Sequence, residues 1–304
     1  MANFKRTVTP EEIEAYCRDG VVCLRGALSA EWVAVVKDAV DDAERRYRET
    51  PADLAGATQA TLEHSHLLPM GQLSDMMEAQ GMNVLRDVKT GGDGQYILVN
   101  NAVMDYPAVQ RLAHESPLAE LAAQLFGASK INFLFDQIFI KQPGANTRTA
   151  FHQDWGYFHV QGEQVASFWT AAEPVAKENG GMGYVRGSHH WDLYSPNAFI
   201  SQDVAEDAEL PVLPDIEGFE ADYDIVYFDV EPGDVIVHDY RLAHGSRGNT
   251  SLDRTRRAVS LRFAGDDVTA LRRSSAPAEF PIDANLKDGD PLDSDTYPVV
   301  WRKS

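Results

Sequence analysis

The sequence predicts a mainly β fold, in which a jelly-roll core carries α-helices on its outside. In the amino-terminal part of the chain, apolar residues recur at three-to-four-residue spacing, which is typical of amphipathic helices. From residue 131 onward, short β-prone runs are separated by Gly, Pro, Asn and Asp. These runs follow one another without helices between them, which favours a sandwich or barrel over a βαβ arrangement.

Helices are expected on both sides of a central stretch in the first 130 residues. Thr9, followed by proline and two glutamates, is a helix start, because a threonine caps the first turn and carboxylates suit its positive end. A short strand is expected at 21–25, and Ser29 then begins a second amphipathic helix. Residues 107–126 predict a further helical pair that ends at Gly127.

Between these helices, residues 51–106 have weak periodicity and an unusual methionine content. The residues that stand out are Met70, Met76, Met77, Met82 and Met104, together with His64 and His66. Methionine is flexible and polarizable, so the 64–106 segment fits an adaptable lid over an apolar substrate. Filler packing between helices is the other interpretation, and the two histidines are expected on the substrate side or at the surface rather than on a metal.

Strands are expected throughout residues 131–265. The predicted ranges are 132–141, 147–152, 164–171, 183–186, 224–229, 234–239 and 256–264. The Pro- and Asp-rich tail from 266 to 304 is expected to wrap the surface. We therefore expect a single domain over 1–304, with a helical part at 1–130, the core at 131–265 and a carboxy-terminal surface segment.

Composition excludes several classes of protein. The 304 residues contain 47 acidic and 27 basic side chains, a formal net charge of −20 at pH 7. Such a chain is repelled by phosphate backbones and anionic lipid, so neither nucleic acid nor a membrane is an expected partner. No apolar run is long enough to span a bilayer and no secretion signal begins the chain. The two cysteines are too few for a disulfide framework, and we expect two buried, reduced thiols in a cytoplasmic protein.

Two segments of the β half supply a metal-binding set. In the first, His152 and Asp154 are two residues apart on an expected strand, so both side chains project from one face. In the second, His244 ends a β run immediately before Gly-Ser, where the backbone can bend around a ligand. Two histidines and one carboxylate form a facial triad that leaves coordination positions open, as in non-haem Fe(II) oxygenases. His238 is not placed among the ligands, because Asp-Tyr follows it where Gly-Ser follows His244.

The strand expected at 256–264 separates its two faces clearly. Arg257, Val259, Leu261 and Phe263 form a largely apolar face suited to packing under helices. Arg256, Ala258, Ser260 and Arg262 form the other face, where small residues leave room for a ligand. A guanidinium on that face is a bidentate carboxylate receptor. Strand parity therefore selects Arg256, with Arg254 in reserve.

Six sequence blocks together resemble the phytanoyl-CoA dioxygenase-like family of Fe(II)- and 2-oxoglutarate-dependent oxygenases. In chain order they are His152-Gln153-Asp154, Trp169-Thr170-Ala171-Ala172-Glu173, Glu178-Asn179-Gly180-Gly181, Arg186-Gly187-Ser188-His189, His244-Gly245-Ser246 and Arg256-Arg257-Ala258. They occur in the family's order and approximate spacing over about residues 130–265. The resemblance implies a double-stranded β-helix, the cupin-like form of the jelly roll.

The resemblance also implies roles for particular residues. His152, Asp154 and His244 match the Fe(II) ligands, and Arg256 matches the residue that binds the far carboxylate of 2-oxoglutarate. Ser246 matches the hydroxyl that assists this arginine, and Trp169 matches a tryptophan near the cosubstrate. Tyr157 and Gln137 occupy positions that often line the same pocket.

The function implied by the resemblance is oxidation of an unactivated C–H bond, with consumption of O2 and release of succinate and CO2. Asp154 points to hydroxylation or another oxidative outcome, because related halogenases have a small residue at that position. We expect a small-molecule substrate, either an apolar natural product or a free acid or amino acid. The alternatives are a cupin-like metal-dependent hydrolase or isomerase and a non-catalytic ligand-binding protein, neither of which needs a fixed dicarboxylate receptor such as Arg256.

Overall fold

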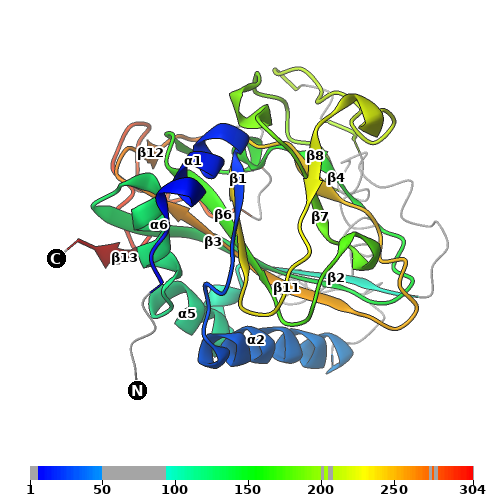
Figure 1. The fold of residues 1–304 in the computed structure, drawn as a ribbon. Coiled ribbons are helices and arrows are strands. Elements are labelled where there is room, and N and C mark those ends of the chain that lie inside the picture. The colour runs from blue at the N-terminus through cyan, green and yellow to red at the C-terminus, as the bar shows by residue number, and fades with distance from the viewer. Residues whose placement is uncertain are drawn as a thin grey trace, which may run out of the picture.

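Two antiparallel sheets face each other in the computed structural model of the chain (Figure 1). The structure describes residues 6–49, 94–199, 202–204, 208–273, 276 and 280–303. The larger sheet consists of β1 (Val21–Leu24), β2 (Tyr96–Asn100), β3 (Lys130–Lys141), β6 (Val165–Ala171), β9 (Val235–Asp239), β11 (Arg256–Ala264) and β13 (Val299–Arg302). Its strand order is β1-β9-β6-β11-β3-β13, and β2 also pairs with β3.

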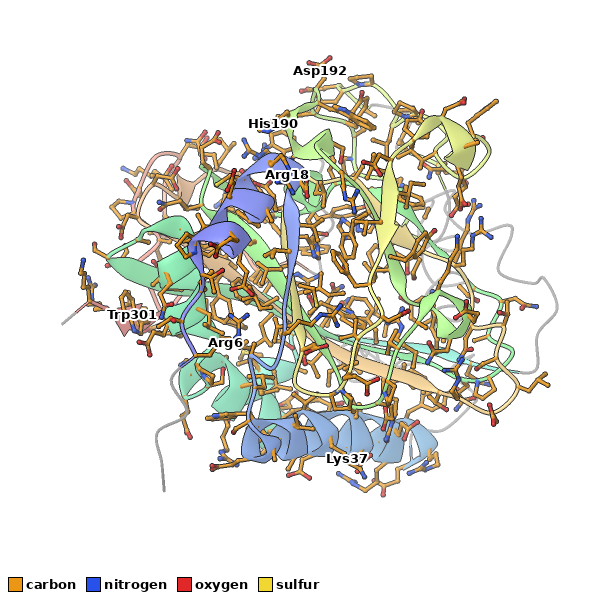
Figure 2. All side chains as sticks on the ribbon, viewed as in Figure 1. Arg6, Arg18, Lys37, His190, Asp192 and Trp301 are labelled. Atoms are coloured by element: carbon orange, nitrogen blue, oxygen red, sulfur yellow. The ribbon has the colours of Figure 1, made fainter. Side chains whose placement is uncertain are left out.

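The smaller sheet has the order β4-β10-β7-β8. Its strands are β4 (Thr149–His152), β7 (Met182–Val185), β8 (Ile225–Tyr227) and β10 (His244–Ser246), and a separate pair is formed by β5 (Val160–Gln161) and β12 (Thr269–Ala270). Figure 2 shows side chains filling the space between the two sheets. The predicted jelly-roll core is therefore confirmed, and every strand expected between 132 and 264 is present within a few residues of its expected bounds.

The helices cover the outer face of the larger sheet. They are α1 (Pro10–Asp19), α2 (Ala30–Glu49), α5 (Pro107–His114) and α6 (Leu118–Phe126). In Figure 1, α2, α5 and α6 lie on the side of this sheet that faces away from β7 and β8. Their apolar faces pack on Val259, Leu261 and Phe263 of β11 in one buried cluster. The face of β11 that the sequence analysis assigned to the helices is thus confirmed.

Local signals at the helix ends act as the sequence predicts. At the start of α1, Thr9 and Glu12 form a capping box, in which each side chain accepts a hydrogen bond from the other residue's backbone N–H. Gly20 ends this helix at φ 75°, a conformation that favours glycine. A side chain there would also collide with His189, because an added Cβ lies 2.4 Å from its Nδ1.

Two described strands of the larger sheet were not predicted. β2 is buried at all five positions, so it lacks the alternation that marks a strand with one solvent-facing side. β13 pairs with β3 at the edge of the larger sheet, so the tail does more than wrap the surface as expected. Phe280, Leu292 and Tyr297 of the tail are buried as well. Both strands extend the larger sheet around the long strand β3.

Several other expectations have different outcomes. Cys17 is exposed and Cys23 is half-buried, so the expectation of two buried thiols is wrong. Met104 is exposed on the 3-10 turn η2 (Ala102–Met104), whereas the other methionines and the two histidines of the 64–106 segment lie outside the described residues. Among the described residues, no helix is long and apolar enough to cross a membrane.

Candidate metal and cosubstrate site

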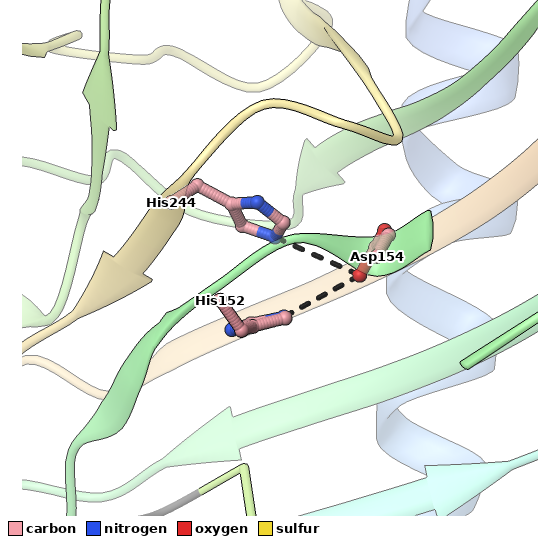
Figure 3. Close-up of side chains that lie close together, drawn as sticks. All are labelled: His152, Asp154 and His244. Atoms are coloured by element: carbon pink, nitrogen blue, oxygen red, sulfur yellow. Dashed lines mark ion pairs between the residues drawn. The ribbon is translucent and has the colours of Figure 1, made fainter. Parts of the chain in front are cut away.

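A triad of two histidines and one aspartate lies between the two sheets (Figure 3). His152 ends β4, Asp154 begins the 3-10 turn η3 (Asp154–Tyr157), and His244 begins β10. Strands β4 and β10 pair so that His244 lies directly opposite His152. One ligand atom from each of the three residues lies within 4.8 Å of the other two, and all three side chains are buried. The structure therefore brings together the three predicted metal ligands.

In each histidine of the triad, one ring nitrogen is engaged in a hydrogen bond with the backbone and the other points toward Asp154. Nδ1 of His152 lies 2.8 Å from the carbonyl of Ala150, and Nδ1 of His244 lies 2.8 Å from the carbonyl of Leu242. Since a carbonyl only accepts, each Nδ1 carries the hydrogen and each Nε2 keeps a lone pair. These Nε2 atoms lie 3.4 Å and 3.8 Å from Oδ1 of Asp154, as the dashed lines in Figure 3 show. This arrangement fits a metal ion ligated by two Nε2 atoms and one carboxylate oxygen.

The protonation states also suit a metal. Burial would raise the pKa of Asp154, but the adjacent side chains of His152 and His238, and then the nearby His244 and Arg262, hold it well below its usual range. Burial, followed by the neighbouring His238 and His152, lowers the pKa of His244 well below its usual value. The set is therefore a carboxylate with a neutral imidazole at neutral pH, which is the state that binds a divalent cation.

Arg256 points into the same interior from the first position of β11. It is 1% exposed and lies opposite Lys141 in the β11–β3 ladder. Its Nε donates to the carbonyl of Gly180 at 3.2 Å, and its Nη2 donates to Oγ of Ser246 at 3.5 Å. Its Nη1 has no hydrogen-bond partner, and burial lowers its pKa. The guanidinium lies 5.8 Å from the ring centroid of Trp169, so Arg256, Ser246 and Trp169 meet as expected.

Lys141 is a second buried cation that the sequence analysis did not identify. Its Nζ donates to Oγ of Ser246 at 2.8 Å and to the carbonyl of Arg247 at 2.9 Å, and the side chain is fully buried. Burial, and then the charge of Arg256, lower its pKa well below the usual range. Within the described chain, neither cation forms an ion pair with a carboxylate, so the cradle formed by Lys141, Ser246 and Arg256 suits an anion. Alternation along β3 places Lys141 on the same face as Gln137, so strand parity could have identified Lys141 from the sequence.

Unpaired buried polar atoms gather around the triad and this cradle. Among the described residues, eleven buried side-chain nitrogen and oxygen atoms lack a hydrogen-bond partner. Seven of them belong to inward-facing residues, namely Trp169, Tyr184, His238, Arg256, Ser260 and Arg262. Buried polar groups are normally paired, so this concentration indicates that polar ligands complete the interior.

Gln137 and Tyr157 lie at the metal end rather than at the cradle. Gln137 donates to Oδ1 of Asn100 at 2.8 Å and accepts from Nη2 of Arg262 at 2.5 Å. The ring of Tyr157 meets that of His152 edge-on at 5.6 Å, and its hydroxyl donates to the carbonyl of Asn197 at 2.7 Å. Both residues are in the interior, whereas Trp169 and Phe139 lie beside Arg256, each with its ring centroid 5.8 Å from the guanidinium.

Phe199 adds an aromatic wall that the sequence analysis missed. Its ring lies 5.0 Å from that of His152 and stacks on Phe139 at 6.4 Å. Its φ is 66°, a left-handed conformation that bulky residues rarely adopt and that concentrates at functional sites. Its carbonyl accepts from the backbone N–H of Ala150 at 2.7 Å, which fixes the ring beside the triad. No sequence pattern marks this residue, since its place depends on a loop conformation.

His238 lies beside the triad, although it is not one of the three grouped residues. Its ring centroid is 4.3 Å from that of His244, and its side chain is almost fully buried. The sequence analysis did not place His238 among the ligands because of the two residues that follow it. Strand parity, however, places His238 on the inner face of β9 with Ile236. Of the other histidines, His189 is buried against the carbonyl of Cys17, and His190 is exposed.

Comparisons with known proteins agree with this geometry. The family model described as phytanoyl-CoA dioxygenase (PhyH) matches residues 16–258. A probable phytanoyl-CoA dioxygenase of Caenorhabditis elegans is 24% identical over 200 residues, and the match covers 62% of this chain and 62% of that protein. A phytanoyl-CoA dioxygenase domain-containing protein of Danio rerio is 23% identical, with 86% of this chain and 92% of that protein covered.

Solved structures with the same fold cover nearly the whole chain. The α-ketoglutarate-dependent epimerase SnoN from nogalamycin biosynthesis superposes with a TM-score of 0.62 at 21% identity, covering 97% of this chain and 96% of that one. EctD from S. alaskensis, crystallised with 2-oxoglutarate and 5-hydroxyectoine, superposes with a TM-score of 0.58 at 19% identity, covering 91% and 87%. At these identities the likeness establishes the cupin-like jelly-roll fold.

Proposed function

Because the chain belongs to the phytanoyl-CoA dioxygenase family, we propose that it is an Fe(II)- and 2-oxoglutarate-dependent oxygenase that hydroxylates a C–H bond of a small organic molecule. The observation that carries this proposal is the buried triad of His152, Asp154 and His244 next to a carboxylate-free cationic cradle. Strands from both ends of the described chain, β1 and β13, belong to the larger sheet, so we propose that 1–304 acts as a single oxygenase domain.

The metal ligands in this proposal are the two Nε2 atoms and Oδ1 of Asp154. When bound, Fe(II) together with 2-oxoglutarate and O2 supplies the oxidising power, and succinate and CO2 are the coproducts. These three residues would hold the ion and would leave its remaining coordination positions for the cosubstrate and O2. Burial of the triad to a few per cent exposure excludes bulk water from these positions.

The far carboxylate of 2-oxoglutarate is assigned to the cradle. Arg256 offers a free Nη1, while Lys141 and Ser246 provide a second cation and a hydroxyl within hydrogen-bond reach of each other. A dicarboxylate brings the negative charge that these two buried cations lack. Holding its far end fixes the orientation of the other end toward the triad before O2 arrives.

The substrate is assigned to the side of His152 that carries Phe139, Tyr157 and Phe199. These rings offer an apolar surface, and Gln137 and Asn100 lie at its polar margin. We therefore propose a small molecule with an apolar part, either a natural product or a free acid or amino acid. SnoN has been crystallised with nogalamycin RO and EctD with 5-hydroxyectoine, which shows that small molecules occupy this fold in those proteins.

The cradle also bears on the alternative functions. A cupin-like hydrolase or isomerase, or a ligand-binding protein, does not require two buried cations at a fixed distance from the metal ligands. In the part of the chain that the structure describes, Lys141 and Arg256 are buried without carboxylate partners, which would serve no purpose in such a protein. An oxygenase that anchors a dicarboxylate uses both.

Anaerobic titration tests the proposal without knowledge of the substrate. Fe(II) followed by 2-oxoglutarate is added to the metal-free protein, and the weak visible charge-transfer band of the chelate is recorded. We expect the band in the wild type, no band in His152→Ala, and in Arg256→Ala a band that requires a higher concentration of 2-oxoglutarate. Absence of the band in the folded wild type contradicts the proposal. Succinate release in the presence of candidate substrates then identifies the substrate class.

A further inference from the structure

The two carboxylate oxygens of Asp154 have different surroundings. Oδ1 faces the Nε2 atoms of His152 and His244, which is the direction of the proposed metal. Oδ2 accepts a hydrogen bond from Oγ of Ser167 at 2.8 Å. Two further donors approach Oδ2 at 3.8 Å, namely Nε2 of His238 and Nε of Arg262. The proposed metal site accounts for the surroundings of Oδ1 but not for the donors around Oδ2.

The three groups around Oδ2 form one row across the larger sheet. In the β6–β9 ladder, Ser167 pairs with His238, and in the β6–β11 ladder, Ser167 pairs with Arg262. Directly paired residues on adjacent strands share a face, so all three side chains project into the interior at the same level. We call His238, Ser167 and Arg262 the cross-strand row. The row comes from the larger sheet, whereas both ligand histidines come from the smaller one.

The row is buried and incompletely paired. His238 is 2% exposed, Ser167 is fully buried and Arg262 is 4% exposed. Among the described residues, both ring nitrogens of His238 and Nε of Arg262 lack hydrogen-bond partners. The ring of Tyr184 also lies 5.2 Å from that of His238, and the low exposure of the imidazole keeps bulk solvent from it. The acceptor that its Nε2 approaches is Oδ2 of Asp154, at 3.8 Å.

We propose that the cross-strand row is a positioning device that holds Oδ2 of Asp154 away from the metal, with His238 as a positioning residue in it. This inference rests on the proposed function, because it assumes that Oδ1 is a metal ligand. A carboxylate that binds through both oxygens takes two coordination positions, whereas one that binds through Oδ1 alone takes one. Holding Oδ2 therefore keeps three positions open, which suffices for a chelating cosubstrate and O2.

Direct ligation by His238 is the competing role, and the geometry disfavours it. His238 approaches the oxygen that faces away from the other two histidines. The group whose ligand atoms all lie within 4.8 Å of one another contains His152, Asp154 and His244 without His238. The row also contains a serine and an arginine, which are donors to an oxygen rather than ligands to a divalent ion.

The test measures Co(II) binding to the metal-free protein and then 2-oxoglutarate binding to the Co(II) protein. His238→Phe keeps the ring shape and removes the donor, so we expect Co(II) affinity to fall by about tenfold to a hundredfold. His238→Gln places an amide N–H near the position of Nε2, and we expect it to restore the affinity to within about threefold of the wild type. Ser167→Ala removes the 2.8 Å hydrogen bond and is expected to weaken Co(II) binding by about tenfold.

The outcomes separate the inference from the proposed function. If the wild type binds neither Co(II) nor 2-oxoglutarate, the proposed function fails. If the wild type binds both and His238→Phe and Ser167→Ala bind Co(II) as tightly, the positioning role is wrong. If His238→Phe and His238→Gln lose affinity equally and shift the Co(II) absorption bands, His238 is a ligand and the positioning role is again wrong. Melting of each metal-free variant shows which are folded, and Ser167→Ala decides the question if His238→Phe does not fold.

Discussion

Two adjacent arginines project from opposite faces of the larger sheet, and their interaction partners differ. On the outer face, Arg257 forms ion pairs with Glu173, in the loop after β6, and with Asp41 and Glu44 of α2. On the inner face, Arg256 meets a serine, a backbone carbonyl and two aromatic rings, and one of its nitrogens has no partner. The charge of Arg257 is balanced by carboxylates of the folded chain, whereas among the described residues Arg256 has no counter-ion. The comparison shows that the groups around an arginine distinguish a charge that stabilises the fold from a charge that is available to bind a ligand.

The largest expected effect comes from the two proposed ligand histidines of the smaller sheet, which face the inner face of the larger one. His152→Ala and His244→Ala remove a ligand that the remaining residues do not replace, so we expect metal binding and succinate release to fall to background. Equilibrium dialysis with Fe(II) under anaerobic conditions measures the first quantity. His190→Ala, at an exposed histidine, is the matched control and should bind the metal as the wild type does.

Exchanging the two adjacent arginines tests the comparison itself. Arg256→Ala is expected to weaken 2-oxoglutarate binding on the order of a hundredfold, because a buried charge-assisted pairing is lost. Arg257→Ala is expected to leave that affinity unchanged and to lower the free energy of unfolding by about 1 kcal/mol through loss of its ion pairs. Calorimetric titration and urea unfolding measure the two effects. If both variants lose affinity equally, the distinction between the faces does not hold.

Lys141→Met removes the second cation of the cradle and is expected to weaken 2-oxoglutarate binding by about tenfold. The same change alters the pH dependence of stability. Since burial lowers the pKa of Lys141 in the folded state, the unfolded chain binds more protons between that lowered pKa and the usual value near 10.5. Wild-type stability without ligand should therefore rise with pH across that window. Urea unfolding at several pH values checks this, and an unchanged slope in Lys141→Met contradicts it.

The smallest expected effect concerns an acidic residue of the outer face. Burial raises the pKa of Asp136 to about 7, although its Oδ2 accepts from the backbone N–H of Val103 at 3.0 Å. The folded state then binds more protons than the unfolded chain between about pH 4 and 7, so stability should fall as pH rises through that range. Thermal melting of Asp136→Asn should show a weaker fall, while its 2-oxoglutarate affinity should equal that of the wild type.

Much of the fold and most of the triad follow from periodicity and spacing in the sequence. Alternation on β11 placed Arg256 inward and Arg257 outward. The His-x-Asp spacing brought two ligands together, but the expectation that both lie on one strand is wrong, because β4 ends at His152 and Asp154 begins η3. The same parity argument, applied to β3 and β9, identifies Lys141 and His238. His238 was set aside on the residues that follow it, although parity carries more information than chain neighbours about which side chains meet.

Other features depend on pairing that the sequence does not encode locally. The position of His244 opposite His152 results from the β4–β10 register, and the cross-strand row results from two further ladders. β2 has no alternation because it is buried at every position. Phe199 acquires its place from a left-handed backbone conformation stabilised by Asn197 and Ala150.

The β4–β10 register places His244 directly opposite His152, so a metal ion bound by both histidines would link two strands of the smaller sheet. An ion held by both strands resists their separation, so a cell starved of iron is expected to hold a form of this protein whose β4–β10 amides exchange with deuterium sooner. Backbone exchange at this single ladder thus reports iron occupancy without any assay of turnover.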